Sequence, residues 1–156
     1  MADAEGPDSP SGGRLEPLLA ITDRFRPRTE RAFLERVVAA ARDEVGQPDL
    51  RVSLLLTDDA ELAKLHADYL DDPTPTDVLS FESEDGVDIA VSVERARHEA
   101  RCRGHYIRAE LALYVVHGVL HACGHDDHED DDRARMRAAE QRVLRSLGLT
   151  VDPVDE

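Results

Sequence analysis

The segment from His117 to His128 reads HGVLHACGHDDH and is the part of the chain richest in side chains that can bind a metal ion. His117 and His121 are four residues apart, so on a helix their imidazoles lie one above the other and can converge on one ion. Gly124 follows, where a residue with positive φ would end the helix and turn the chain back. We therefore expect a third ligand from the next loop, either Asp127 or His128.

A histidine pair at this spacing also occurs on solvated helix surfaces, where it has no function. Here the neighbouring sequence LALYVVHGVL is almost entirely apolar, which predicts a buried helix. Histidines in such a helix cost free energy unless they have partners. The sequence therefore predicts one divalent metal site, with zinc as the expected ion, since imidazole nitrogen and carboxylate oxygen are both ordinary zinc ligands.

The residue after the first histidine limits the chemistry of this site. Zinc peptidases of the HExxH type carry their general-base glutamate there, whereas this chain has Gly118. Three protein ligands would leave a fourth position for a water, whose pKa zinc can lower to about 7. Such an ion could also polarise a phosphoryl oxygen. The spacing thus favours another hydrolase over a metallopeptidase, and the residues alone do not identify the substrate.

Composition narrows the classes of function. The chain has 156 residues, 41% of them hydrophobic, which is sufficient for one domain with a core. Its net charge of −15 argues against coating nucleic acid by bulk electrostatics, and DNA is not an expected partner. Any RNA contact must be local, and Arg97, Arg101 and Arg108 are the candidates for phosphate contacts. An ordinary solvated helix surface is the alternative explanation for these three.

We divide the chain into a disordered acidic tail at residues 1–13, one folded domain at residues 14–150 and a short C-terminal tail at residues 151–156. The first segment, MADAEGPDSPSGG, has no apolar core and resembles neither a signal peptide nor a presequence. Cys102 and Cys123 give no disulfide framework, and no apolar run is long enough to span a membrane. These features predict a cytoplasmic protein with no membrane association.

Hydrophobic periodicity predicts both strands and helices. We expect strands at residues 18–23 and 51–56, and a hairpin from residues 77–81 and 87–93. Thr29 is the expected cap of a helix ending near residue 45, and Asp58 with Glu61 predicts a capping box for the next one. Further helices are expected at residues 94–103, at residues 108–123 and from residue 129 onward. This order predicts an α+β fold in which a small mixed sheet packs against several helices, with the metal site at the C-terminal end of the central buried helix.

Two motifs resemble those of a known family. HGVLHACGHD is similar to the HGxLHLxGYDH signature of the YbeY endoribonucleases, also called rRNA maturation factors, and TPTDVLSF resembles the PTDVLSF segment of that family. The resemblance covers the order of elements from about residue 18 to residue 147. It implies a cytoplasmic metal-dependent endoribonuclease that acts in ribosomal RNA processing, with ribosomal RNA or a ribosomal subunit as its partner. The family holds one zinc-like ion with three histidines.

The chain departs from the family pattern at two positions. The third family histidine falls on Asp127, while His128 comes one residue later; ungapped spacing also places the family methionine on Met136. The family arginine after the tyrosine at position 69 is replaced by Leu70, so no catalytic side chain can be assigned from the resemblance. Three functions remain: a metal-dependent endoribonuclease, a non-catalytic ribosome-assembly factor with a structural metal, and a metallopeptidase.

Overall fold

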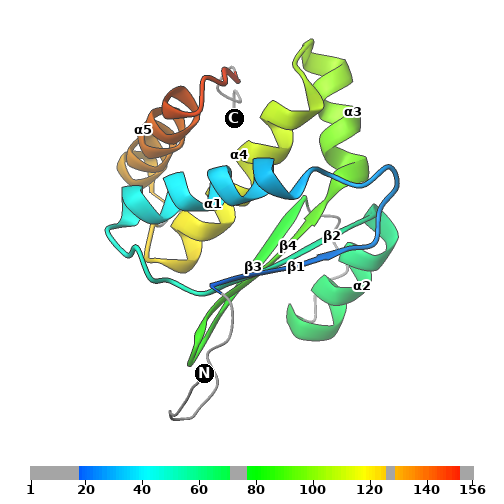
Figure 1. Cartoon of the computed structure of the whole chain (residues 1–156), viewed down its shortest axis with the longest axis horizontal. Coiled ribbons are helices and arrows are strands. Elements are labelled where there is room, and N and C mark those ends of the chain that lie inside the picture. Colours follow the sequence, from blue (N-terminus) through cyan, green and yellow to red (C-terminus); the bar gives the residue numbers. More distant parts are fainter. Residues whose placement is uncertain (1–17, 71–76, 126–128, 152–156) are drawn as a thin grey trace, which may run out of the picture.

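One mixed β-sheet organises the chain. The computed structural model describes residues 18–70, 77–125 and 129–151. In these residues four strands form one sheet in the order β1-β2-β4-β3, and Figure 1 shows helices on both sides of it. They are β1 (Leu19–Asp23), β2 (Val52–Thr57), β3 (Val78–Ser83) and β4 (Gly86–Ser92). The first two strands and β4 are parallel, and β3 is antiparallel to β4, which confirms the expected hairpin.

The two faces of the sheet are covered by different helices. Alternate residues of β2, among them Leu54 and Leu56, are buried on the face covered by α1 (Arg31–Val45) and α4 (Ile107–Ala122), and α5 (Asp130–Ser146) packs against these two helices. A smaller apolar cluster on the other face joins Leu62 of α2 (Asp59–Leu70) to Leu79 and Ala90. Helix α3 (Val93–Arg103) follows β4 directly in the sequence and lies beside α4 (Figure 1).

Helix α4 is the centre of the larger core. Most of its residues are apolar and buried, and a helix of that kind is stable only when it is enclosed by other elements. It contacts β3 and β4 on one side and α1, α3 and α5 on the others. Gly118 permits the close approach to the sheet, because a Cβ at this position would lie 2.9 Å from Ile89 Cγ2 and 3.3 Å from Val78 Cγ2. The most buried helix of the fold therefore carries the histidine motif.

The end of α4 has the hydrogen bonds of a Schellman motif. Gly124 takes a φ of 105°, its N–H donates to the carbonyl of His121, and the N–H of His125 donates to that of Leu120. The turn predicted from Gly124 is confirmed. The chain is thereby directed away from the helix axis just after the second histidine, toward residues 126–128.

The α+β fold with its small mixed sheet is confirmed, and two details of helix capping differ from expectation. Glu30 is the N-cap residue of α1 and makes no side-chain cap, while the N–H of Thr29 donates to Asp23 Oδ2 at 2.9 Å; the Thr29 cap was wrong. Only half of the expected capping box forms, since Asp58 Oδ1 accepts from the N–H of Glu61 but the Glu61 carboxylate accepts from Thr57 Oγ1 instead.

The expected tail at residues 1–13 and most of that at residues 151–156 lie outside the described residues. Val151 is described and is buried, and its carbonyl accepts from Gln141 Nε2. Within the described ranges, none of the helices combines the length and the apolar character that a membrane span requires.

Candidate metal centre

His117 and His121 lie together on one face of α4. Their imidazole rings are parallel to within 3°, with centroids 6.3 Å apart. His121 is exposed and His117 is partly exposed, so solvent can reach both rings although the helix that carries them is otherwise buried. The arrangement agrees with the spacing argument: two nitrogen donors share one face at the C-terminal end of the helix.

A carboxylate from α5 orients the first imidazole. Glu140 Oε2 lies 2.7 Å from His117 Nδ1, and the glutamate is 7% exposed. Because an ionised carboxylate can only accept a hydrogen bond, this contact places the ring proton on Nδ1. Nε2 is then the nitrogen through which His117 would bind a metal ion. Metal-binding histidines commonly have such a carboxylate partner, which fixes the ring and makes it a better donor.

Glu140 was not predicted from the sequence, although a signal was present. It falls on the inward stripe of α5 that includes Met136, Ala139 and Val143. A charged residue among buried apolar ones requires a partner, so its position indicated a polar contact across the core. What the pattern of one helix does not provide is the identity of that partner, which lies 23 residues earlier.

The expected third ligand, Asp127 or His128, lies outside the described residues. Among residues 18–70, 77–125 and 129–151, no three or more histidine, cysteine, aspartate or glutamate side chains are grouped to hold an ion. The donors that are described still suit a divalent transition metal, because two imidazoles share a face and one has its tautomer fixed by a buried carboxylate.

The position after His117 faces the sheet and not the imidazoles. A side chain at residue 118 would meet Ile89 and Val78 before it could turn toward the site. The general base of an HExxH peptidase therefore has no room here, for a reason independent of the sequence motif. This packing disfavours the metallopeptidase alternative.

Cys123 is not part of the imidazole pair. It is half-buried against the main core and lines an open groove of about 790 Å³ at the C-terminal end of the helix. Burial raises the pKa of its thiol. Acidic side chains dominate the rim of this groove, so it would repel RNA phosphates; they are Asp49, Glu82, Glu84 and Asp85.

The three candidate arginines lie at the other end of α4 and on α3. Arg108 is nine residues before His117, which places it about 14 Å away along the helix and on the opposite side. Its guanidinium stacks on Phe33 of α1 at 4.4 Å, and that of Arg97 stacks on Phe25 at 5.2 Å. Arg101 is exposed. The structure thus separates these arginines from the histidines.

Comparison with known proteins identifies the family and agrees with this fold. The family model described as Endoribonuclease YbeY matches residues 22–148. An endoribonuclease YbeY from Solibacter usitatus is 43% identical over 135 residues, covering 83% of this chain and 88% of the relative. One from Heliobacterium modesticaldum is 38% identical over 137 residues, covering 75% and 82%.

The solution structure of TM1509 from Thermotoga maritima has the same fold, with a TM-score of 0.59 at 21% identity over 83% of this chain and 91% of that one. Fold, histidine helix and relatives together define an α+β hydrolase that acts on RNA. The chain belongs to the YbeY family of endoribonucleases, which act in ribosomal RNA processing and ribosome maturation.

Proposed function

We propose that this chain cleaves ribosomal RNA phosphodiesters with one divalent ion, zinc, held by His117, His121 and a third ligand from the loop after α4. Asp127 is the proposed third ligand and His128 the alternative. The observation that carries the proposal is the parallel imidazole pair whose first ring is fixed by Glu140. Ribosomal RNA or a ribosomal subunit in the cytoplasm is the proposed partner, in keeping with the family.

Two described residues, Glu140 and Gly118, support this proposal through their effect on the histidines and on α4. Glu140 would hold His117 so that Nε2 is left to bind the ion, and Gly118 lets α4, which carries both imidazoles, lie close against β3 and β4. When bound, a divalent ion supplies Lewis-acid stabilisation of the charge that develops on phosphoryl oxygens. The imidazoles must remain neutral to bind it, so acid conditions should weaken both binding and cleavage.

A second function is favoured by one substitution. The family arginine is replaced by Leu70, the last residue of α2, and leucine cannot donate a hydrogen bond to a phosphate. If that arginine supplied the charge stabilisation needed for cleavage, this chain would be a non-catalytic assembly factor in which the metal is structural.

Cleavage of RNA by purified, zinc-loaded protein distinguishes the two functions. We expect wild-type protein to cleave single-stranded RNA, His117→Ala to lose cleavage together with zinc, and Leu70→Arg to cleave faster. Cleavage by Leu70→Arg alone would identify the wild-type chain as an assembly factor. Casein cleavage without RNA cleavage would instead support a peptidase.

A further inference from the structure

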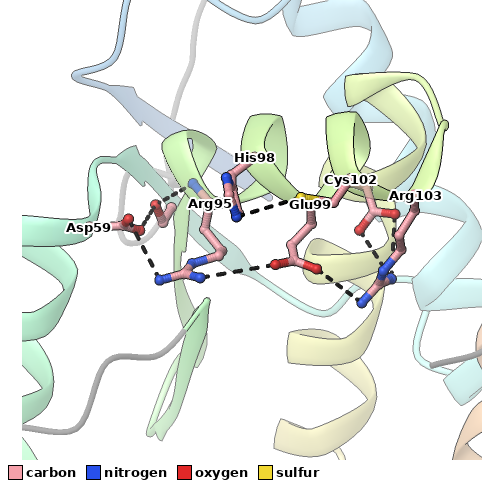
Figure 2. Close-up of polar contacts among 8 residues, drawn as sticks. Asp59, Arg95, His98, Glu99, Cys102 and Arg103 are labelled. Carbon is pink, nitrogen blue, oxygen red and sulfur yellow. Dashed lines mark hydrogen bonds and ion pairs between the residues drawn. The ribbon is translucent and has the colours of Figure 1, made fainter. Parts of the chain in front are cut away.

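The arginines of α3 fall into two sets that face opposite ways. Figure 2 shows Arg95, Glu99 and Arg103 in one row, in which Glu99 Oε1 lies 3.3 Å from an Arg103 nitrogen and Glu99 Oε2 lies 4.0 Å from an Arg95 nitrogen. Arg103 also reaches the buried carboxylate of Glu110 at 3.4 Å. This row is internally neutralised and joins α3 to α4.

Arg97 and Arg101 form the second set. At about 100° per residue they lie some 40° apart on the helix, and Glu99 lies about 200° from Arg97, on the other side. In the described part of the chain, no carboxylate pairs with Arg101. Glu94 lies one turn before Arg97 on the same side of α3, and its Oε1 accepts from the N–H of Asp59 in α2. Among the described residues, Glu99 pairs with Arg95 and Arg103, and neither Glu94 nor Glu99 forms an ion pair with Arg97 or Arg101.

Two phenylalanine rings lie under the neighbouring guanidinium groups, those of Arg97 and Arg108 across segments and that of Arg36 within α1. Arg97 stacks on Phe25, and Arg108 and Arg36 both stack on Phe33, at 4.4 and 5.8 Å. Such stacking uses the face of a guanidinium, while its N–H donors lie in the plane and stay available for oxygen acceptors. The rings also restrict the side chains in advance, which lowers the entropy lost when an anion binds.

The corner between α3 and α4 adds an exposed aromatic ring. Tyr106 is 83% exposed and Ile107 is 40% exposed. The stretch from Ala100 to Ala109, ARCRGHYIRA, contains arginines but no acidic residue, in a chain whose net charge is −15. A ring in solvent beside cations is the combination that binds single-stranded nucleic acid, since bases stack on the ring and phosphates contact the cations.

We propose that these residues form a binding surface for single-stranded RNA, here called the arginine surface: Arg36, Arg97, Arg101, Arg108 and Tyr106. The four arginines contact backbone phosphates and Tyr106 stacks on a base. The inference rests on the proposed endoribonuclease function and extends it, because the surface lies on the side of α4 opposite His117. It would hold a part of the substrate several nucleotides from the cleaved bond.

Two arginine variants test the phosphate contacts. Arg101 and Arg145 both lie in the last turn of a helix, both are exposed, and only Arg101 belongs to the arginine surface. Both variants are made in the His117→Ala background, in which we expect no cleavage, and binding of a single-stranded oligoribonucleotide is measured by fluorescence anisotropy from about 50 to 300 mM NaCl, a range in which counterion release is resolved. A gel of each sample confirms that the strand is uncut.

We expect Arg101→Gln to weaken binding and to reduce the slope of log K against log salt by about 0.7, the value for one phosphate contact on a single strand. Arg145→Gln should change neither. An equal loss of RNA affinity in both variants would show that only the net charge of the protein matters, and it would overturn the proposal. Unchanged binding in Arg101→Gln would also overturn it, whether the surface then binds a protein or nothing.

The aromatic contact has its own readout. The chain contains no tryptophan, so Tyr106→Trp introduces a single fluorophore at the corner. We expect its emission to be quenched as RNA saturates the protein, because bases stack on the indole. Unchanged emission when the protein is saturated with RNA would show that Tyr106 does not belong to the arginine surface.

These experiments test the proposed arginine surface and the proposed endoribonuclease function independently. If the protein cleaves RNA but Arg101→Gln binds as wild type, the surface is wrong and the endoribonuclease function stands. If binding depends on Arg101 but no RNA is cut, the surface stands and the proposed cleavage fails. Substrate length adds a control, since only RNA long enough to span both sites should show a higher KM in Arg101→Gln, with kcat unchanged.

Discussion

At the residue scale, the contact between His117 and Glu140 leads to a first prediction. Glu140→Ala should weaken zinc binding by about 10–100-fold, the usual effect of losing the carboxylate behind a metal-binding histidine. Glu140→Gln should lose less, because an amide oxygen can still accept from Nδ1. Zinc affinity is measured by competition with a chelator, and the His117 tautomer by nitrogen NMR.

Glu44→Gln is the control for charge alone, since Glu44 contacts Arg142 at the junction of α1 and α5. It should bind zinc as wild type does. Equal affinity in Glu140→Ala and wild type, with the fold intact, would show that the carboxylate contributes only to packing.

The third ligand gives a second prediction. Ungapped spacing and the position of Met136 favour Asp127, whereas the preference of zinc for imidazole favours His128. We expect Asp127→Ala to lose more zinc affinity than His128→Ala. A larger loss in His128→Ala, with unchanged circular dichroism, would reverse the assignment.

The sequence predicted those parts of the site that depend on local spacing. His117, His121 and Gly124 belong to one helix and its end, so helix periodicity and turn preference were sufficient to place them. Glu140 and the phenylalanine rings under Arg97 and Arg108 are contacts between distant segments. Their partners depend on how the helices pack, which no local pattern specifies.

At the element scale, Gly118 sets how closely α4 approaches the sheet. In an open helix, replacing glycine by alanine would stabilise by about 1 kcal/mol. Here the added methyl group would meet Ile89 Cγ2 at 2.9 Å, so we expect Gly118→Ala to destabilise by about 1–3 kcal/mol. Urea denaturation measures the change in the free energy of unfolding.

A double mutant tests whether contact with Ile89 causes the expected destabilisation by Gly118→Ala. Ile89→Ala removes the atom nearest the added methyl group, so Gly118→Ala should be neutral or stabilising in that background. If the cost of Gly118→Ala were the same in both backgrounds, contact with Ile89 would not explain this glycine.

The boundaries of the elements were predictable, and their arrangement was less so. Alternation in β2 and the apolar stripe of α1 identified both segments, and the loop after β3 indicated the hairpin. The pairing of β2 with β4 instead of β3 is not visible in either segment. The cap at Thr29 was wrong by one position, because Glu30 is the N-cap residue of α1 and Thr29 precedes it, with its N–H donating to Asp23 Oδ2.

At the scale of the whole molecule, buried Glu110 should make stability depend on pH. Burial raises the pKa of Glu110 above its ordinary value of 4.5, and the nearby Arg103 acts in the opposite direction. At a pH between the ordinary pKa of Glu110, which applies to the unfolded chain, and its raised pKa in the folded protein, the folded state holds a proton that the unfolded state has released. Stability then falls as the pH rises through this window.

The matched variant isolates this effect, because Glu110→Gln cannot titrate. We expect the free energy of unfolding of wild type, minus that of Glu110→Gln, to decrease from pH 4.5 toward neutral pH. Denaturation curves across this range provide the comparison. A difference that grows with pH would mean that the ion pair with Arg103 outweighs the cost of burial.

The orienting carboxylate lies 23 residues after the imidazole that it holds, in α5, the last helix of the described residues. Protein synthesis proceeds from the N-terminus, so a growing chain carries both histidines well before it carries Glu140. The proposed site therefore cannot take its final form until α5 has been made and has docked on α4. A ribosome making this protein would be exposed to its nuclease activity only after the segment that forms α5 has been made.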